Sequence, residues 1–276
     1  RFEGTAAEPP GVIRNCRTGV KFDPYTALAN NGITALNNRS DFTRARFEWT
    51  EDYENIHGEN NPIAHADLNG VRVVFRGTHF AHTGQYPEYS SQLGYGIRAH
   101  NSSAWVLPAG SSTCVFTGLD HGVHADASST APRLTVLGAQ FNSNVCGVYA
   151  EDLRYPFIRN NTFSYGDREV VLDNPLELYW FDAHRGIFLT GCNGLRVLNN
   201  TLNGVNEPFA ETEGIVIGYT TTGSESVRSN TVNGITRAYV GEGECANTSA
   251  PAAIGFQFLC NTNNGNDRNI WSRVPA

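Results

Sequence analysis

The sequence predicts an all-β solenoid of about ten stacked coils, and three observations support this. A glycine followed by Ile, Val or Phe recurs along the chain, mostly at intervals of 20 to 28 residues. Each copy holds short β-rich runs closed by Gly or Asn, as in the stretch 186–204. No helical periodicity appears between these runs. A unit this short cannot bury its apolar side chains alone, so the copies must stack on one another.

The stretch 186–204 has close copies on either side. In each copy a Gly–apolar pair is followed by an Asn-Thr-apolar triplet. The Gly and the Asn are 14 residues apart in the copies that begin at Gly147 and Gly186, and 16 apart in the copy that begins at Gly214. The glycine marker itself recurs at Gly19, Gly32, Gly70, Gly96, Gly122, Gly147, Gly186, Gly214, Gly234 and Gly255. Leucine-rich repeats share this period, but their Leu-x-x-Leu-x-Leu frame is absent, so a β-solenoid is favoured.

Taken in order, residues 1–276 are expected to form one domain. Residues 1–18 predict an entry segment whose first apolar strand ends at Asn15-Cys16. The marker intervals of 38 residues before Gly70 and 39 before Gly186 each fit one coil plus an insertion. Insertions are therefore expected at about 38–69, 78–94 and 164–184. The last marker starts another coil, and Ile270-Trp271 is expected to be its next strand.

The composition bounds the class of protein. The chain has 276 residues, 40% of them hydrophobic, with a net charge of −7. It shows no basic stripe, and Lys21 is its only lysine, so nucleic acid is not an expected partner. No apolar run approaches the roughly 20 residues of a membrane-spanning helix. The chain lacks Met and a signal peptide, so we expect it to be part of a longer chain.

The cysteines leave two interpretations open. They lack the paired CxxC spacing of zinc sites. They could form disulfides in an oxidising compartment, or they could be buried thiols that act as small apolar residues. On sequence distance alone, Cys245–Cys260 is the most plausible disulfide. The six residues are Cys16, Cys114, Cys146, Cys192, Cys245 and Cys260.

The repeat also predicts which side chains share a face, because alternate residues of a strand point to the same side. With the marker glycine as position zero, positions one and three are apolar and should face the core. Position three is Ala99, Ala125, Ala150, Leu189, Ile217 and Phe258 in successive copies. Positions two and four should face outward. Position two is Arg98, His124, Tyr149, Phe188, Val216 and Gln257, and position four is His100, Asp126, Glu151, Thr190 and Gly218.

If the coils stack in parallel register, neighbours in a column lie about 4.8 Å apart. Asp126 and Glu151 would then be side by side on the surface. Their expected neighbours are Arg98, His100, His124 and Tyr149. At this place the repeat brings carboxylate, imidazole, guanidinium and phenol side chains together from distant parts of the sequence.

Asparagines are expected at the corners of the coils. Asn tolerates left-handed geometry and bonds local backbone groups, and repeated at one corner its amides can form a ladder up the stack. The pairs at 160–161 and 199–200, together with Asn230, fit this role. Asn38, Asn101, Asn160, Asn199 and Asn247 match the Asn-x-Ser/Thr acceptor pattern. An inward ladder residue could not carry a glycan, which leaves Asn38, Asn101 and Asn247 as the glycosylation candidates.

The rung at 186–202, Gly-Ile-x-Leu-x-Gly-Cys-x-Gly-x-x-Val-x-x-Asn-x-Leu, resembles right-handed parallel β-helix repeats of the pectate-lyase-like superfamily. The chain is most similar to large secreted β-helical proteins of Bacteroidota exported by type IX secretion. Coils of that kind resemble the stretches 15–20, 68–71 and 255–261. The resemblance implies a right-handed parallel β-helix in a secreted, extracellular or cell-surface protein. It is specific for the fold and weak for activity.

Enzymes on this fold place carboxylates and basic residues on an outward strand face. If the chain is an enzyme, a polysaccharide lyase or glycoside hydrolase, the catalytic candidates are Asp126, Glu151, His124 and Arg98. Two carboxylates about 5 Å apart suit a retaining glycosidase, whereas a lyase would hold Ca²⁺ and use Arg98 as base. The polygalacturonase and pectate-lyase motifs are missing, and Leu119-Asp120-His121 resembles the latter only weakly. Six histidines are candidates for a cluster, but without metal spacing neither a metal nor another cofactor is expected: His65, His79, His82, His100, His121 and His124.

Two non-catalytic hypotheses complete the set. A carbohydrate-binding module would use exposed aromatic residues to stack on sugar rings, and the candidates are Tyr86, Tyr89, Tyr149, Tyr179 and Trp180. A structural or adhesive segment of a filament, stalk or adhesin needs only the repeat. Its expected partners are further segments of the same chain or neighbouring copies stacked end to end, with polysaccharide as a further candidate. The structural hypothesis ranks first and the carbohydrate-active enzyme second.

Overall fold

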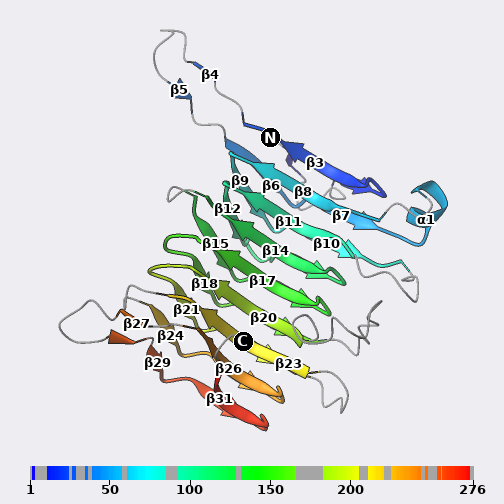
Figure 1. The fold of residues 1–276 in the computed structure, drawn as a ribbon. Coiled ribbons are helices and arrows are strands. Elements are labelled where there is room, and N and C mark those ends of the chain that lie inside the picture. Colours follow the sequence, from blue (N-terminus) through cyan, green and yellow to red (C-terminus); the bar gives the residue numbers. More distant parts are fainter. Residues whose placement is uncertain are drawn as a thin grey trace.

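The chain folds into a right-handed parallel β-helix whose three long sheets run the length of the stack (Figure 1). Each coil contributes one strand to each sheet, and each strand pairs in parallel with the same strand of the next coil. A computed structural model describes residues 2–3, 11–24, 27–28, 35–36, 39–57, 61–84, 93–128, 132–165, 183–204, 211–220, 225–243, 246–247, 254–255 and 257–273.

Within the described residues, each of the three sheets has nine strands. The first sheet consists of β1 (Phe2–Glu3), β6 (Arg39–Thr43), β9 (Arg72–Arg76), β12 (Ser103–Leu107), β15 (Leu134–Leu137), β18 (Phe157–Arg159), β21 (Arg196–Leu198), β24 (Ser226–Arg228) and β29 (Gln257–Leu259). The second consists of β2 (Val12–Arg14), β7 (Arg46–Trp49), β10 (His79–His82), β13 (Val115–Thr117), β16 (Gln140–Asn142), β19 (Thr162–Ser164), β22 (Thr201–Asn203), β25 (Thr231–Asn233) and β30 (Thr262–Asn264).

The third sheet consists of β3 (Thr18–Phe22), β8 (Ala64–Asn69), β11 (Tyr95–His100), β14 (His121–Asp126), β17 (Cys146–Glu151), β20 (Ala183–Thr190), β23 (Glu211–Gly218), β26 (Arg237–Glu242) and β31 (Arg268–Arg273). The elements outside the three sheets are α1 (Asp52–His57) and two antiparallel pairs, β4 (Ala27–Leu28) with β5 (Ala35–Leu36) and β27 (Ala246–Asn247) with β28 (Ile254–Gly255). In the part of the chain that the structure describes, no helix is long and apolar enough to cross a membrane.

The recurring glycine has a steric cause in the third sheet. A Cβ placed on Gly96 would lie 2.5 Å from the backbone oxygen of Gly122, and one on Gly122 would lie 2.7 Å from that of Gly147. A side chain at either glycine would therefore collide with the next coil. Gly19, Gly147, Gly186 and Gly214 are equally crowded at the same position of their strands, which explains the recurring glycine in these coils. The position is not glycine throughout, because the register puts His65 there in β8 and Ala238 there in β26.

The predicted inward columns are confirmed in the middle coils. Position one forms a register-matched column that is fully buried: Ile97, Val123, Val148, Ile187 and Ile215. Position three forms a second buried column: Ala99, Ala125, Ala150, Leu189 and Ile217. Burial of these apolar side chains, at about 1.5–3 kcal/mol for each large one, holds successive coils together.

Three marker assignments are wrong. Gly70 and Gly234 lie in left-handed turns outside the strands, with φ of +63° and +59°. Gly255 belongs to β28, and Phe258 pairs with Val227 in the first sheet instead of continuing the position-three column. A left-handed glycine followed by an apolar residue looks like the marker in sequence, which is why these turns were misassigned. Gly32 lies outside the described residues.

The predicted insertions are smaller than expected. Residues 38–69 include β6, β7 and β8, which form a complete coil, and only the turn with α1 is added to it. Within 78–94, residues 79–82 form β10, and within 164–184 the ends belong to β19 and β20. These strands are short and alternate apolar and polar residues over only part of their length. The sequence pattern therefore predicts loops where the structure has strands. The remaining parts, 85–92 and 166–182, lie outside the described residues.

Both ends of the predicted organisation also contain strands. The entry segment 1–18 holds β2, which ends just before Asn15-Cys16 as expected, and Thr18 already begins β3. Ile270-Trp271 lies in β31 and confirms the predicted final strand.

Two stacks of like side chains run through the core. Rings from the second sheet stack nearly parallel with centroids 4.6–5.1 Å apart, in the order Phe47, Phe80, Phe116, Phe141 and Phe163. At the corner between the first and second sheets the predicted amide ladder is confirmed. It runs through Asn161, Asn200, Asn230 and Asn261, with Nδ2–Oδ1 distances of 2.9, 2.9 and 3.1 Å.

The structure corrects which corner asparagines face inward. Asn161 and Asn200 are the buried ladder residues, whereas Asn160 and Asn199 precede them, have left-handed φ of +56° and +54°, and are exposed. The sequence-based exclusion of Asn160 and Asn199 as glycan acceptors was therefore wrong, because the acceptor pattern falls on the outward member of each pair.

Candidate functional site

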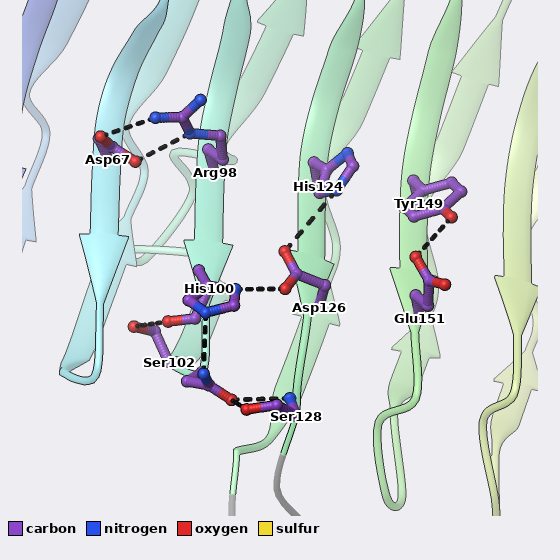
Figure 2. A network of polar contacts seen from close by, with 10 residues as sticks. Asp67, Arg98, His100, Ser102, His124, Asp126, Ser128, Tyr149 and Glu151 are labelled. Atoms are coloured by element: carbon purple, nitrogen blue, oxygen red, sulfur yellow. Dashed lines mark hydrogen bonds and ion pairs between the residues drawn. The ribbon is translucent and has the colours of Figure 1, made fainter.

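The predicted chemistry gathers on the outward side of the third sheet, across β8, β11, β14 and β17 (Figure 2). We call these outward side chains the third-sheet face. Position two places Arg98, His124 and Tyr149 in register, and position four places His100, Asp126 and Glu151 in register. The predicted outward columns are thus confirmed in these three coils, and Asp126 lies directly beside Glu151. Further along, Val216 and Gly218 continue the columns in register but are buried, and Gln257 belongs to the first sheet.

Arg98 is fully engaged by a carboxylate of the preceding coil. Its Nε and Nη2 atoms donate to the two oxygens of Asp67, each at 2.9 Å (Figure 2). These hydrogen bonds raise the pKa of Arg98 further, against the opposing effect of partial burial. A bidentate pair fixes the guanidinium and keeps it protonated. This geometry opposes the role of general base that a lyase would require of Arg98.

Asp126 is held by histidines on two strands. His100 Nδ1 lies 2.5 Å from Asp126 Oδ1, and His124 Nε2 lies 3.8 Å from Oδ2. The other nitrogen of His100 contacts the amide nitrogen of Asn101 at 2.9 Å. If Asn101 donates to Nε2, His100 must carry its proton on Nδ1 and donate it to Asp126. The Asn101 oxygen in turn accepts from the backbone N–H and hydroxyl of Ser128.

His124 lies between this carboxylate and an aromatic ring. It stacks on Tyr149 with the centroids 4.6 Å apart, and Tyr95 meets it edge-on at 5.3 Å. Burial lowers the pKa of His124, and Asp126 partly opposes that shift. Its Nδ1 is buried and has no hydrogen-bond partner in the described structure. His124 is therefore mainly a neutral packing residue at neutral pH.

Glu151 is paired within its own strand. The hydroxyl of Tyr149 donates to Glu151 Oε2 at 2.9 Å (Figure 2). Burial, and then this carboxylate, raise the pKa of Tyr149. Tyr149 is half-buried, and its ring also meets Phe188 edge-on. Its ring stacks on His124 and its hydroxyl is bonded to Glu151, which leaves less of the ring for stacking on a sugar.

Asp126 and Glu151 still form a carboxylate pair on neighbouring strands. Adjacent parallel strands are about 4.8 Å apart, a spacing that suits two-carboxylate chemistry. Each carboxylate accepts hydrogen bonds from its protein neighbours. Among the described residues, no group of three or more His, Cys, Asp or Glu side chains is placed to hold a metal ion.

The six histidines fall into separate groups. His65 and His82 pack around Trp49 in the second coil, whereas His100, His121 and His124 lie on the third-sheet face. His79 lies in β10 of the second sheet.

Several other predicted site residues cannot be placed. Tyr86, Tyr89, Tyr179, Trp180, Asn38 and Cys245 lie outside the described residues, and so does the side chain of Asn247 in β27. Cys260 is exposed, and its pairing with Cys245 stays a prediction because Cys245 is not among the described residues. Asn101 is half-buried with its amide engaged by His100 and Ser128. Cys114, Cys146 and Cys192 are buried free thiols, as the second interpretation of the cysteines expected.

Sequence reasoning missed Asp67, the partner of Arg98. Asp67 occupies position two of its coil. Taking Gly70 as the marker glycine of that coil shifts the count and leaves Asp67 unassigned. Aligning Ala66 with Ile97, as the structure does, puts Asp67 beside Arg98. It also missed the aromatic neighbours Tyr95 and His121, which precede the marker glycines and stack 5.1 Å apart. Charge complementarity between aligned coils was the signal that could have found Asp67.

Comparisons with family models, with curated proteins and with solved structures found no match to this chain. The function therefore has to be argued from the fold and from the arrangement of its side chains.

Proposed function

We propose that the chain is a non-catalytic structural or adhesive β-helical segment of a large secreted or cell-surface protein. The observation that carries this proposal is the internal pairing on the third-sheet face. Arg98 is bound to Asp67, Asp126 to His100, and Tyr149 to Glu151. These contacts join one coil to the next or brace a single strand. They support a role in holding a rod together.

The wider biological setting belongs to the same proposal. The resemblance to pectate-lyase-like coils and to Bacteroidota proteins of type IX secretion rests on the sequence of the rungs. We propose that further coils or neighbouring copies stack end to end on this segment.

A carbohydrate-active enzyme is the second candidate. The in-register pair Asp126 and Glu151 favours it, because two carboxylates on adjacent strands of an outward face are the arrangement that glycoside hydrolysis needs. The bidentate pairing of Arg98 weighs against the lyase form of this hypothesis, and Ca²⁺ would be involved only in that form. A carbohydrate-binding module is the third candidate, with Tyr149 as its one described aromatic residue.

Turnover of polysaccharides separates the first two candidates. Release of reducing ends and of unsaturated uronates should be measured on a panel of neutral and acidic polysaccharides, with wild type and with Asp126→Asn/Glu151→Gln. The structural role predicts no product from either protein. Product from wild type that disappears in the double variant would overturn the structural proposal in favour of the enzyme. Product that survives in the double variant would also overturn it, and would place the catalytic groups elsewhere.

A further inference from the structure

The outward side of the first sheet carries arginines that have no acidic partner. From β9 to β29 the described strands of this sheet contain no Asp or Glu. They contain five arginines: Arg72, Arg76, Arg159, Arg196 and Arg228. None of the five makes an ion pair within the described structure, and four of them are exposed. A chain of net charge −7 therefore presents one strongly basic face.

Two of these arginines border one surface cavity. Arg159, Leu198, Arg228 and Leu259 are register partners on consecutive strands. Arg159 and Arg228 are thus two strand spacings apart, roughly 10 Å, with Leu198 between them. A cavity of about 350 Å³ opens here, lined by Arg159, Leu198, Asn199, Arg228, Ser229, Leu259 and Cys260. Its floor is apolar at Leu198, and its rim is cationic.

The corner next to the cavity is neutral and rich in hydrogen-bonding groups. The second sheet continues from it with threonines in register: Thr162, Thr201, Thr231 and Thr262. Beside them an outward amide ladder joins Asn203, Asn233 and Asn264, with Nδ2–Oδ1 distances of 2.9 Å. The four tight corners at 159–162, 198–201, 228–231 and 259–262 contain no carboxylate. In these coils the surface offers hydroxyls and amides beside the arginines.

We propose that this face, centred on Arg159 and Arg228, binds an anionic polysaccharide. Guanidinium groups recognise planar carboxylates and other oxyanions through paired, charge-assisted hydrogen bonds. An apolar floor suits the face of a sugar ring, and the flanking Thr and Asn columns match its hydroxyls. A repeating polymer would meet an arginine of this column on alternate coils and a threonine on successive coils, so weak contacts add along its length. The inference goes beyond the structural role and does not depend on it.

A polysaccharide fits these groups better than nucleic acid does. Single-stranded nucleic acid binding relies on aromatic platforms on which bases stack. Among the described residues that line this cavity, none carries an aromatic side chain. The arginines are separated by apolar or neutral residues and do not form a continuous basic groove.

Binding to immobilised protein tests the proposal. The probes are polygalacturonate for carboxylates, dextran sulfate for sulfate esters, neutral dextran, and single-stranded and duplex DNA. Wild type should bind at least one of the two acidic polysaccharides, and this binding should weaken as the salt concentration is raised. It should show no binding to neutral dextran. The acidic polysaccharide that binds more tightly identifies the anionic group, carboxylate or sulfate ester, that this face recognises. Arg159→Gln/Arg228→Gln should weaken the binding at least tenfold.

A control variant removes the same charge elsewhere. Arg17→Gln/Arg268→Gln changes two exposed arginines outside the first sheet and should bind within about twofold of wild type. Melting curves of both variants confirm that they fold. Absence of binding to both acidic polysaccharides overturns the proposal, as does equal weakening in the two double variants. Tighter binding of DNA than of either polysaccharide overturns the choice of ligand class.

Discussion

The side-chain amide of Asn161 donates to the side-chain oxygen of Asn200, one coil further along, at 2.9 Å. The same oxygen accepts the backbone N–H of Asn161 at 3.0 Å, and the Asn200 amide reaches the backbone oxygen of Ile158 at 3.1 Å. Asn200 is buried and bridges to Asn230 in the same way. One side chain therefore satisfies backbone groups that the corner removes from any sheet.

Replacing Asn200 by Ala should lower the free energy of unfolding by about 2–3 kcal/mol, because buried groups at Asn161 and Ile158 lose their partners. Urea titration followed by circular dichroism measures this. Asn199→Gly is the matched control at the exposed neighbour, whose left-handed φ suits glycine. It should change stability by less than about 0.5 kcal/mol. Equal losses in the two variants would show that the ladder does not stabilise the corner.

Gly122→Ala should destabilise the fold by about 1–3 kcal/mol. The new Cβ would lie 2.7 Å from the Gly147 oxygen and from the Phe141 ring, so the coils would have to separate locally. Gly241→Ala is the control, because a Cβ there meets nothing within 4 Å. Thermal melts of both variants make the comparison. A loss at Gly241 as large as that at Gly122 would contradict the steric explanation of the repeating glycine.

Glu213→Ala should cost about 3 kcal/mol or more. The Glu213 side chain is fully buried, and it receives Arg185 at 2.8 Å and Arg237 at 2.9 Å from the neighbouring strands. Removing this carboxylate takes away a charged partner from two largely buried guanidinium groups, those of Arg185 and Arg237. Glu211→Ala removes a half-exposed partner of Arg237 and should cost under about 1 kcal/mol. Denaturant titration that finds the reverse order would contradict this account of the third sheet.

Acid should destabilise the fold through buried neutral histidines. Burial lowers the pKa of His65 to about 3, and this ring stacks on Trp49 at 3.6 Å. The unfolded chain binds a proton near pH 6.5, so stability is complete above that pH and falls as the pH drops toward 3. His65 alone should contribute up to about 1.4 kcal/mol per pH unit in that window.

Comparing the pH dependence of wild type with that of His65→Gln isolates this effect. Unfolding free energies should be measured from pH 7 to pH 4. The slope of unfolding free energy against pH should be smaller in the variant, by the amount that corresponds to about one proton. This difference does not depend on the stability of the variant at pH 7. Identical slopes would mean that His65 is not buried in its neutral form.

Much of the fold could be predicted because local rules repeat with each coil. Ile97 and Val123 are apolar at one position and Ala99 and Ala125 at another, so the alternation of the third sheet predicts their burial and the pairing of Asp126 with Glu151. The first sheet has no such marker, and its coil-to-coil distances vary. Arg159 and Arg228 therefore could not be aligned from sequence, and the basic face stayed hidden.

The corners show a different limit. Asn tolerates left-handed geometry and also donates from its amide, so the pair Asn199-Asn200 suits both roles in either order. Only the path of the chain decides which residue turns inward. Likewise Gly70 and Gly96 look alike in sequence, although one opens a turn and the other avoids a carbonyl oxygen of the next coil.

The most direct test of the structural role is the unfolding free energy of Asp126→Asn/Glu151→Gln. A network that holds coils together should lose about 1–2 kcal/mol when both carboxylates become amides. Glu51→Gln/Asp267→Asn, which changes two exposed carboxyl groups, should leave the value within about 0.5 kcal/mol of wild type. Catalytic carboxylates are commonly held at a cost to stability. An unchanged or increased stability of the Asp126/Glu151 variant would contradict the structural account and favour the enzyme.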